Sequence, residues 1–436
     1  MVGDVPEKRT GRDTLPISAL SRTDESIVRP QGKSQPDAAA VPSLFVFHTE
    51  ANVGYAIEPI ERLLYEVGLE IAGGDPSQVH FAFRKLDRKP PRSLPRGFRN
   101  VLVYDHSDLN PRNIERLAKY VRDHKIRLVV IWDIQATHPL FRSLHQAGAQ
   151  AVVSIWGAPI SSPMPFWKLA LKQLEMRFSR SKLDGLIFES RAMADLAVCG
   201  RGVSPEMIDV VHTGVDVSAY KPGRRAYVYE ALQFPRDKKV IVYSGHMEAR
   251  KGVRTLVEAA IDLLHHRKRR DVCFLICGNK GDESEPFQRL YDGLDTAELI
   301  RFGGYRSDMP QIYAGCFAGV IPSSGWDSFP RSAIEMSASG LPVVASRLGG
   351  LPEAVLHGQT GILVEPSNAS MLADSLELLL DQPDLAAEYG KRGKQRCDKE
   401  LDRATNAKRL RDVFLKRLSL KQPGHASADH QRGGRP

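Results

Sequence analysis

The stretch PSSGWDSFPRSAIEMSASGLPVVASRLGGLPEAVLHGQTGILVEP, residues 322–366, decides the fold. Two short runs within it, residues 342–346 and 361–366, are apolar over most of their length rather than alternating, as strands covered on both faces are. A third strand ends at residues 323–325, and a helix begins at residues 329–332. The order strand, helix, strand predicts a βαβ unit and hence a parallel sheet.

The same alternation extends outward over most of the chain. Further apolar runs occupy residues 43–48, 100–104, 127–132, 151–156, 185–190, 209–212, 239–245, 273–278, 299–304 and 319–324. Helical segments such as residues 111–124 separate several of them. The pattern predicts an α/β protein with two Rossmann-like, doubly wound domains, which bind ligands at the carboxyl ends of their strands.

Composition suggests where the domains begin and end. Residues 1–40 and 419–436 lack a hydrophobic period and are expected to be disordered tails. Between them we expect a first domain at 41–220, a linker at 221–238 and a second domain at 239–400. A C-terminal helix at 401–418 could return to the first domain.

The overall charge and the cysteines narrow the class of protein. The 436 residues include 61 Lys and Arg against 52 Asp and Glu, a net charge of +9 that leaves anionic partners open. The chain has no apolar run of about 18 residues and no signal-like N-terminus, so we expect a cytoplasmic protein rather than a membrane-spanning or secreted one. Five scattered cysteines favour a reducing compartment over a disulfide framework.

Cations follow the first strand of the second domain. His246, Arg250 and Lys251 lie between the strand at 239–245 and a helix that begins near residue 253. A helix N-terminus offers free N–H groups and a positive dipole end, which suit phosphate. The segment therefore indicates an anionic ligand, although a solvated loop is the alternative.

Two carboxylates lie close together in the deciding stretch. Asp327 falls in the loop, and Glu335 falls about one turn into the following helix. Such carboxylates can accept hydrogen bonds from sugar hydroxyls while nearby amides bind phosphate. The alternative is that Asp327 caps the helix and Glu335 is a solvated helix residue. The spacing alone leaves both interpretations open.

Several motifs occur together in an order that points to a family. Lys251-Gly252, the Asp327–Glu335 pair and residues 339–346, 349–353 and 358–361 resemble the donor domain of group-1, family-4-like retaining glycosyltransferases with the GT-B fold. Residues 210–216, VVHTGVD, resemble the entry to that family's hinge. The first domain is similar in layout and only loosely in residues.

The resemblance implies sugar transfer from a nucleotide-diphosphate sugar, with retention of anomeric configuration, to a glycan, lipid-linked or small-molecule acceptor. It implies that Glu335 contacts the ribose, Asp327 the donor sugar and Lys251 the departing diphosphate. The other implied substrate contacts are Gly54 near the diphosphate, Asn279, Tyr305 and Arg306 near the base, and Ser328, Phe329, Pro330, Arg331 and Ser332 at the helix N-terminus.

The chain has no Asp-x-Asp pair, which the other major transferase fold uses to chelate metal. We therefore expect Lys251 and its neighbours to replace a divalent ion, with neither metal nor cofactor required.

The chain departs from the family pattern in three places. Asp327 replaces a Glu, His246 replaces an Arg for which Arg250 could substitute, and Trp156 replaces a His that follows a strand of the first domain. These departures keep two alternatives open. One is a sugar-nucleotide epimerase or hydrolase on the same fold, and the other is a catalytically silent sugar-nucleotide-binding partner protein.

One segment of the first domain is both basic and apolar. Residues 163–182 carry five basic residues against one acidic residue, a balance of +4. Five large apolar side chains could share one helix face: Phe166, Trp167, Leu171, Leu174 and Phe178. This pattern indicates peripheral contact with an anionic membrane, and the alternative is a helix that packs this face on its own sheet. We expect no nucleic-acid partner, because no recognisable binding module is present.

Overall fold

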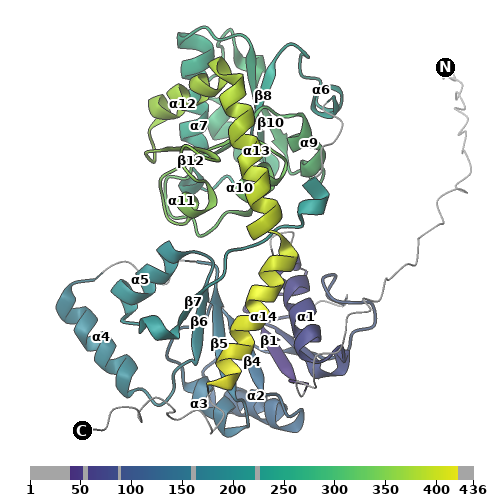
Figure 1. Cartoon of the computed structure of the whole chain (residues 1–436), viewed down its shortest axis with the longest axis vertical. Coiled ribbons are helices and arrows are strands. Elements are labelled where there is room, and N and C mark those ends of the chain that lie inside the picture. The colour runs from purple at the N-terminus through teal and green to yellow at the C-terminus, as the bar shows by residue number, and fades with distance from the viewer. Residues whose placement is uncertain (1–39, 53–56, 87–89, 159–163, 221–225, 421–436) are drawn as a thin grey trace, which may run out of the picture. The chain divides into compact units, whose positions relative to one another are not determined.

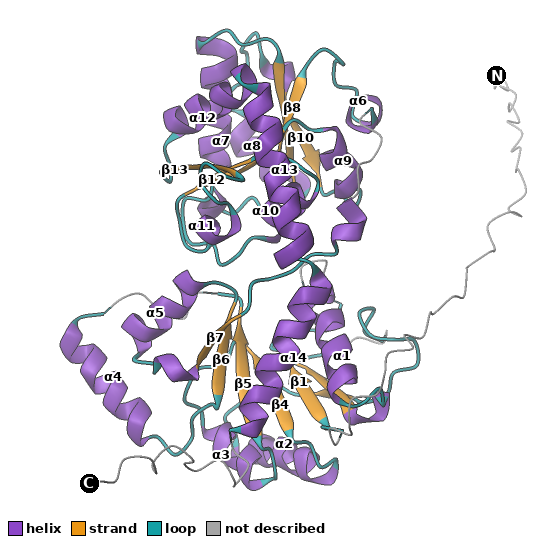
Figure 2. Cartoon of the chain, viewed as in Figure 1, coloured by secondary structure: helices purple, strands orange, loops and turns teal. Residues whose placement is uncertain are grey.

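The computed structural model describes residues 40–52, 57–86, 90–158, 164–220 and 226–420, and these residues belong to one compact unit. They form two parallel sheets with helices packed against them (Figure 2). The predicted tails fall almost entirely outside the described residues. None of the helices in these ranges is long and apolar enough to cross a membrane.

The first sheet has seven parallel strands in the order β3-β2-β1-β4-β5-β6-β7. The strands are β1 (Ser43–Val46), β2 (Val79–Phe83), β3 (Val101–Val103), β4 (Leu128–Trp132), β5 (Ala151–Trp156), β6 (Gly185–Phe188) and β7 (Ile208–Val210). The helices between them are α1 (Glu58–Ile71), α2 (Pro111–Asp123), α3 (Pro139–Gln146), α4 (Phe166–Phe178) and α5 (Arg191–Arg201).

The second sheet has six strands in the order β10-β9-β8-β11-β12-β13. They are β8 (Lys239–Ser244), β9 (Val272–Cys277), β10 (Ile300–Gly304), β11 (Ala318–Ile321), β12 (Val343–Ser346) and β13 (Gly361–Val364). The helices of this part are α6 (Tyr227–Ala231), α7 (Val253–Ile261), α8 (Glu285–Gln288), α9 (Met309–Gly315), α10 (Arg331–Ala338), α11 (Leu351–Ala354), α12 (Ala369–Asp381) and α13 (Pro383–Glu400).

The continuous apolar runs become strands because both faces of each sheet are covered. In β4, Val129 and Ile131 join one hydrophobic cluster, and Leu128 and Val130 join another on the opposite face. Side chains alternate between the two faces of a strand, so only a fully apolar run can fill both clusters. The prediction of an α/β fold with two Rossmann-like parallel sheets is confirmed.

The segment predicted as a linker is partly built into the second domain. Residues 227–231 form α6, and Val228 and Phe234 are buried in the core of the second sheet. The apolar residues among its turn-forming neighbours explain why this part packs. The exact domain boundaries remain predictions.

The last helix, α14 (Arg403–Ser419), packs on the first sheet rather than on the second. It lies beside α1 (Figure 1), and the ring centroids of Phe414 and Phe45 are 6.4 Å apart. The buried Arg417 donates to the Asp209 carboxylate (Nε to Oδ2, 2.8 Å) and to the Glu206 carbonyl (2.9 Å). Apolar contact and a buried ion pair thus hold the helix in place.

We predict that Arg417→Met destabilises the protein by about 3 kcal/mol, because it removes most of the pairing of the nearly buried Asp209 carboxylate. Urea unfolding measures the loss. The control is Arg392→Met, which removes an exposed ion pair with Glu388 on α13 and should cost no more than about 0.5 kcal/mol. Equal losses in the two variants would contradict the role of Arg417.

Candidate functional site

The predicted donor site lies at the carboxyl ends of β8 and β11, which are neighbours in the second sheet. Strand order reverses between these two strands, so the loops that follow them lead apart and leave a site between them. The loops are joined, since the Ser324 and Gly325 N–H groups donate to the Arg250 carbonyl at 2.8 and 3.0 Å. Gly252 permits this approach: a Cβ there would lie 1.8 Å from the Pro322 carbonyl oxygen.

An ion pair connects the two loops. Lys251 Nζ lies 2.9 Å from Asp327 Oδ2, and Ser323 Oγ donates to the same oxygen at 2.8 Å. Asp327 is 5% exposed, so this pair is nearly withdrawn from water. The alternative that Asp327 caps the helix is wrong, because α10 begins after Pro330 without a side-chain cap. Two of the predicted catalytic residues are therefore in direct contact.

Arg250 is fixed beside this pair. Its guanidinium stacks 4.2 Å from the ring centroid of Trp326 and pairs with Glu248 (Nε to Oε2, 2.6 Å). The His246 carbonyl accepts a hydrogen bond from the Tyr243 hydroxyl at 2.7 Å. The loop after β8 thus holds its cations in a defined arrangement next to the loop after β11.

The loop that leads into α10 is held close to Gly349 and Gly350. A Cβ on Gly350 would lie 1.6 Å from the Ser328 carbonyl oxygen, and one on Gly349 would lie 2.2 Å from that of Asp327. Phe329 is buried and stacks on His212, with ring centroids 4.7 Å apart. These contacts position the free N–H groups of the helix N-terminus near Lys251, since Ser328 follows Asp327 directly.

Glu335 lies on α10 with defined partners. Arg331 approaches it to 3.5 Å, and the Glu335 side chain is 17% exposed. Burial, together with the charge and hydrogen bond of Glu335, raises the pKa of Tyr220. Glu335 is therefore not the solvated helix residue of the alternative interpretation.

The residues predicted to lie near the base meet at the ends of β9 and β10. Asn279 Oδ1 accepts a hydrogen bond from the Gly304 N–H at 2.9 Å, which ties the two loops together. Tyr305 is exposed, and Arg306 pairs with Asp308 (Nε to Oδ1, 2.8 Å). The predicted diphosphate contact Gly54 lies outside the described residues.

The first sheet contributes two carboxylates that the sequence motifs did not identify. Asp133 follows β4 in a left-handed conformation (φ 54°) and accepts a hydrogen bond from the Gly157 N–H at 3.0 Å. Trp156, at the position of the family's His, is buried and donates its indole N–H to the Ile134 carbonyl at 3.1 Å. Burial raises the pKa of Asp133. The sequence pattern that could have identified Asp133 is a carboxylate placed directly after an apolar run.

Glu189, the second of these carboxylates, follows β6 directly. It accepts hydrogen bonds from Thr213 Oγ1 at 2.7 Å and from Ser328 Oγ at 3.1 Å. Burial raises the pKa of Glu189 to about 7, against the opposing effect of those two hydroxyls. The carboxylate thus links the end of the first sheet, the segment after β7 and the donor-side loop.

A third carboxylate, Glu353 of α11, contacts the N-terminus of α5. It accepts the N–H groups of Arg191 and Ala192 at 2.8 and 2.9 Å, and His212 Nε2 lies 2.9 Å from it. Burial opposes ionisation of Glu353, but these hydrogen bonds outweigh it and lower the pKa. A negative charge at a helix N-terminus is also favoured by the helix dipole.

Two imidazoles lie at the carboxyl edge of the first sheet. His48 and His106 have ring centroids 6.2 Å apart, and among the described residues neither Nδ1 atom has a hydrogen-bond partner. Burial and the nearby His48 lower the pKa of His106 to about 4, so His106 is neutral at pH 7. A neutral imidazole can donate to or accept from a hydroxyl group.

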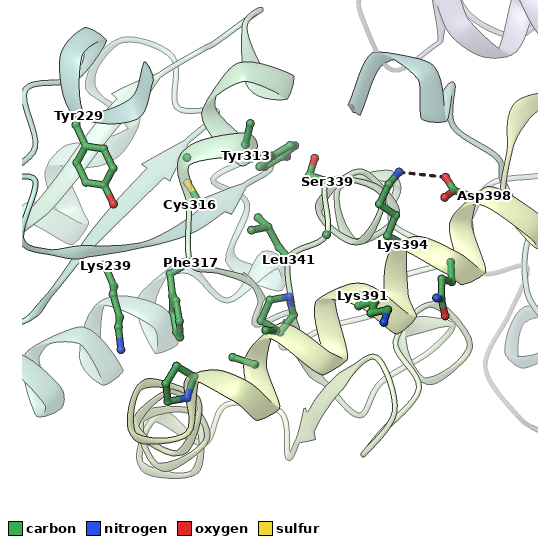
Figure 3. Close-up of a pocket in the computed structure, with 18 residues that line it drawn as sticks. Tyr229, Lys239, Tyr313, Cys316, Phe317, Ser339, Leu341, Lys391, Lys394 and Asp398 are labelled. Atoms are coloured by element: carbon green, nitrogen blue, oxygen red, sulfur yellow. Dashed lines mark hydrogen bonds and ion pairs between the residues drawn. The ribbon is translucent and has the colours of Figure 1, made fainter. Parts of the chain in front are cut away.

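A cavity of about 710 Å³ lies at the opposite edge of the second sheet (Figure 3). Its lining includes Lys239 and Phe317, at the amino ends of β8 and β11, and Lys394, which pairs with Asp398. None of the predicted site residues lines this cavity. Strand direction therefore separates it from the donor site.

Helix α4 presents its apolar face to solvent. Met176 is its only fully buried residue, and it lies on the opposite side of the helix from Trp167, Leu171, Leu174 and Phe178. Leu171 is 61% and Phe178 72% exposed, and Phe166 is 84% exposed. The alternative that this face packs on its own sheet is therefore wrong. Figure 1 shows α4 on the outer side of α5.

Comparison with known proteins finds two family models that follow each other along the chain. The model described as Glycosyltransferase Family 4 matches residues 60–219, and the model described as Glycosyl transferases group 1 matches residues 229–396.

Similar curated proteins include D-inositol 3-phosphate glycosyltransferases. That of Corynebacterium efficiens is 34% identical over 194 residues, which cover 43% of this chain and 46% of the relative. Enzyme 1 of that name from Catenulispora acidiphila is 29% identical over 253 residues, covering 56% of this chain and 59% of the relative. The chain thus spans about half the length of the curated relatives it matches.

Solved structures share the fold over most of the chain. A glycosyltransferase from Rickettsia africae has a TM-score of 0.73 at 18% identity and covers 87% of this chain and 99% of its own. Anabaena Alr3699/HepE in complex with UDP and glucose has a TM-score of 0.68 at 17% identity, with 86% and 99% covered. With the motifs and the two parallel sheets, these matches show that the chain belongs to the group-1 glycosyltransferases with the GT-B fold.

Proposed function

We propose that the protein transfers a hexose from a nucleotide-diphosphate sugar to an acceptor hydroxyl, with retention of anomeric configuration. The observation that carries this proposal is the Lys251–Asp327 pair beside the N-terminus of α10. Cation, carboxylate and free N–H groups converge where strand order reverses, and these are the groups that a sugar diphosphate requires.

The charges fit the chemistry of bond cleavage. Breaking a glycosyl–phosphate bond builds negative charge on the diphosphate and positive charge on the sugar ring. We propose that Lys251, Arg250 and the helix N–H groups stabilise the first, and that the Asp327 carboxylate, which pairs with Lys251, contacts the donor sugar. We propose that these fixed cations neutralise the leaving group without a divalent ion.

The remaining donor contacts follow from the arrangement of the loops. We propose that Glu335 accepts hydrogen bonds from the ribose and that the loops joined by Asn279 and Gly304 border the base. A structural neighbour, Anabaena Alr3699/HepE, was solved in complex with UDP-glucose, which supports a nucleotide-diphosphate hexose as donor.

The acceptor would bind at the carboxyl edge of the first sheet. His48 and His106 offer hydrogen bonds to hydroxyls, and Asp133 adds a carboxylate on the neighbouring strand end. Matched relatives are named for inositol phosphate, which supports a polyhydroxylated acceptor, whether a small molecule, a glycan or a lipid-linked sugar.

We further propose that α4 attaches the protein peripherally to an anionic membrane at the cytoplasmic face. The exposed stripe of Trp167, Leu171, Leu174 and Phe178 is flanked by basic residues, five of which lie in 163–182 against one acidic residue. Aromatic and aliphatic side chains enter the interface while the cations contact lipid phosphates. This surface chemistry favours lipid over a second copy of the chain, whose own α4 would bring the same charge.

We predict that Lys251→Ala lowers kcat/KM for the donor by about 100- to 1000-fold, because one fixed donor to the developing charge is lost. Product analysis of transfer assays measures the loss. Lys399→Ala, which changes an exposed lysine at the end of α13, should leave the rate within about twofold. Unchanged turnover in Lys251→Ala would contradict the site. Release of free or isomerised sugar without acceptor would favour the epimerase or hydrolase alternative.

We predict that transfer proceeds at an undiminished rate in EDTA, because protein cations replace the divalent ion. The measurement is the initial rate with and without EDTA, followed by addition of Mg²⁺ or Mn²⁺. A rate that collapses in EDTA and returns with either ion would disprove metal independence while leaving the transferase proposal in place.

We predict that, in a flotation assay, the protein rises with vesicles of phosphatidylcholine and phosphatidylglycerol. With vesicles of phosphatidylcholine alone it should remain in the bottom fraction. The triple variant Trp167→Ser, Leu171→Ser, Phe178→Ser should lose flotation, because the inserted apolar surface is removed. The matched control is Leu378→Ser, which removes an exposed leucine from α12. Self-association of the wild type that the triple variant abolishes, without vesicle binding, would assign the stripe to a second copy instead.

A further inference from the structure

We propose that Glu189 is a positioning residue for the transfer reaction and that its ionised carboxylate holds the donor-side loop in place through Ser328. This inference rests on the proposed function. It concerns a residue outside every motif on which the family resemblance is based, since residues 185–190 were identified only as an apolar run.

The geometry gives Glu189 two partners from different parts of the chain. Oε1 accepts a hydrogen bond from Thr213, which follows β7, and Oε2 accepts one from Ser328, which precedes α10. One carboxylate therefore spans the end of the first sheet and the loop of the second. An ionised carboxylate accepts such hydrogen bonds more strongly than a neutral group does.

Close backbone packing makes Ser328 sensitive to this contact. The Ser328 carbonyl oxygen lies where a Cβ on Gly350 would be, and the same Cβ would come within 2.8 Å of Ser190 Oγ. Gly350 thus lies against both the loop at Ser328 and Ser190, the residue before α5. The Glu189 carboxylate fixes the side chain of the same residue.

Ser328 transmits the contact to the reacting centre. It directly follows Asp327, whose carboxylate pairs with Lys251. A shift of Ser328 therefore displaces the carboxylate and the ammonium that face the donor. Misplacement of a catalytic group by about 1 Å can cost on the order of 100-fold in rate.

We assign this role to Glu189 rather than to Trp156. Trp156, at the position of the family's His, is buried and its indole N–H is bonded to the Ile134 carbonyl. Among the described residues, Glu189 accepts a side-chain hydrogen bond from the loop 325–330, donated by Ser328.

The surroundings of Glu189 set the pH at which the contact forms. Burial and the Asp133 carboxylate raise its pKa to about 7, and the Arg331 guanidinium of α10 acts in the opposite direction. On the neighbouring elements, His212 after β7 and Glu353 of α11 pair with each other. Protonation of Glu189 leaves one oxygen unable to accept, so the link to Ser328 weakens as the pH falls below about 7.

The test compares Glu189→Gln with Glu206→Gln, an exposed carboxylate before the amino end of β7 that serves as the control. In wild type, kcat/KM should fall as the pH is lowered through about 7. In Glu189→Gln, kcat/KM should not fall over this pH range. At pH 8 its kcat/KM should be about 10- to 100-fold below that of wild type, the range for a lost hydrogen bond to a charged group. A variant that keeps the wild-type pH profile would overturn the proposal.

A second measurement does not require turnover. Unfolding free energies of Glu189→Gln, Ser328→Ala and the double variant form a cycle, and coupling between the two sites should make their losses non-additive. Because the folded pKa of about 7 exceeds the ordinary value of 4.5, wild type should lose stability relative to Glu189→Gln as the pH rises between these values. Additive losses would overturn the proposed contact.

The two proposals fail in different ways. A wild type that neither transfers sugar nor binds UDP refutes the proposed function, while the cycle still reports whether Glu189 holds Ser328. Suppose instead that wild type transfers sugar, that the losses of unfolding free energy in the cycle are additive, and that Glu189→Gln keeps the wild-type pH profile. These results would refute only the role of Glu189.

Discussion

The ion pair between Lys251 and Asp327 is the interaction on which the rest of the site depends. A charged pair so far removed from water is stable only when its other hydrogen bonds are satisfied, and Ser323 supplies one of them. The pair can form because Gly252 lets the loop after β8 approach Pro322, and Gly349 lets a third loop lie against Asp327. The glycines and charges of these three loops therefore serve one structural purpose.

Much of the fold could be predicted from the sequence because parallel strands buried on both faces leave an unambiguous pattern. A run such as residues 127–132 has no polar side to place in water, so it must lie inside a covered sheet. The boundary at residues 221–238 was harder to predict, because Val228 and Phe234 are isolated apolar residues among turn formers. Whether they pack depends on distant partners in the second sheet.

The site was only partly predictable for a related reason. Lys251, Asp327 and Glu335 occur in motifs, whereas Asp133 and Glu189 are single carboxylates after strands and look like any polar residue at a loop. Their burial and their partners arise from segments far apart in the chain, Gly157 for one and Ser328 for the other. The exposure of the apolar face of α4 could not be predicted either, because periodicity defines a helix face but not what covers it.

The return of α14 to the first sheet has a consequence for how the chain folds as it is made. Leu410, Phe414 and Leu418 complete a hydrophobic cluster whose other buried members lie before residue 212. Residues 410–418 must therefore be synthesised before that cluster is complete, whereas among the described residues the buried core of the second sheet includes none beyond Leu401. Domains usually fold in the order of synthesis. In this chain, the core of the second sheet can form while one apolar face of the first sheet is still uncovered, because α14 has not yet been synthesised.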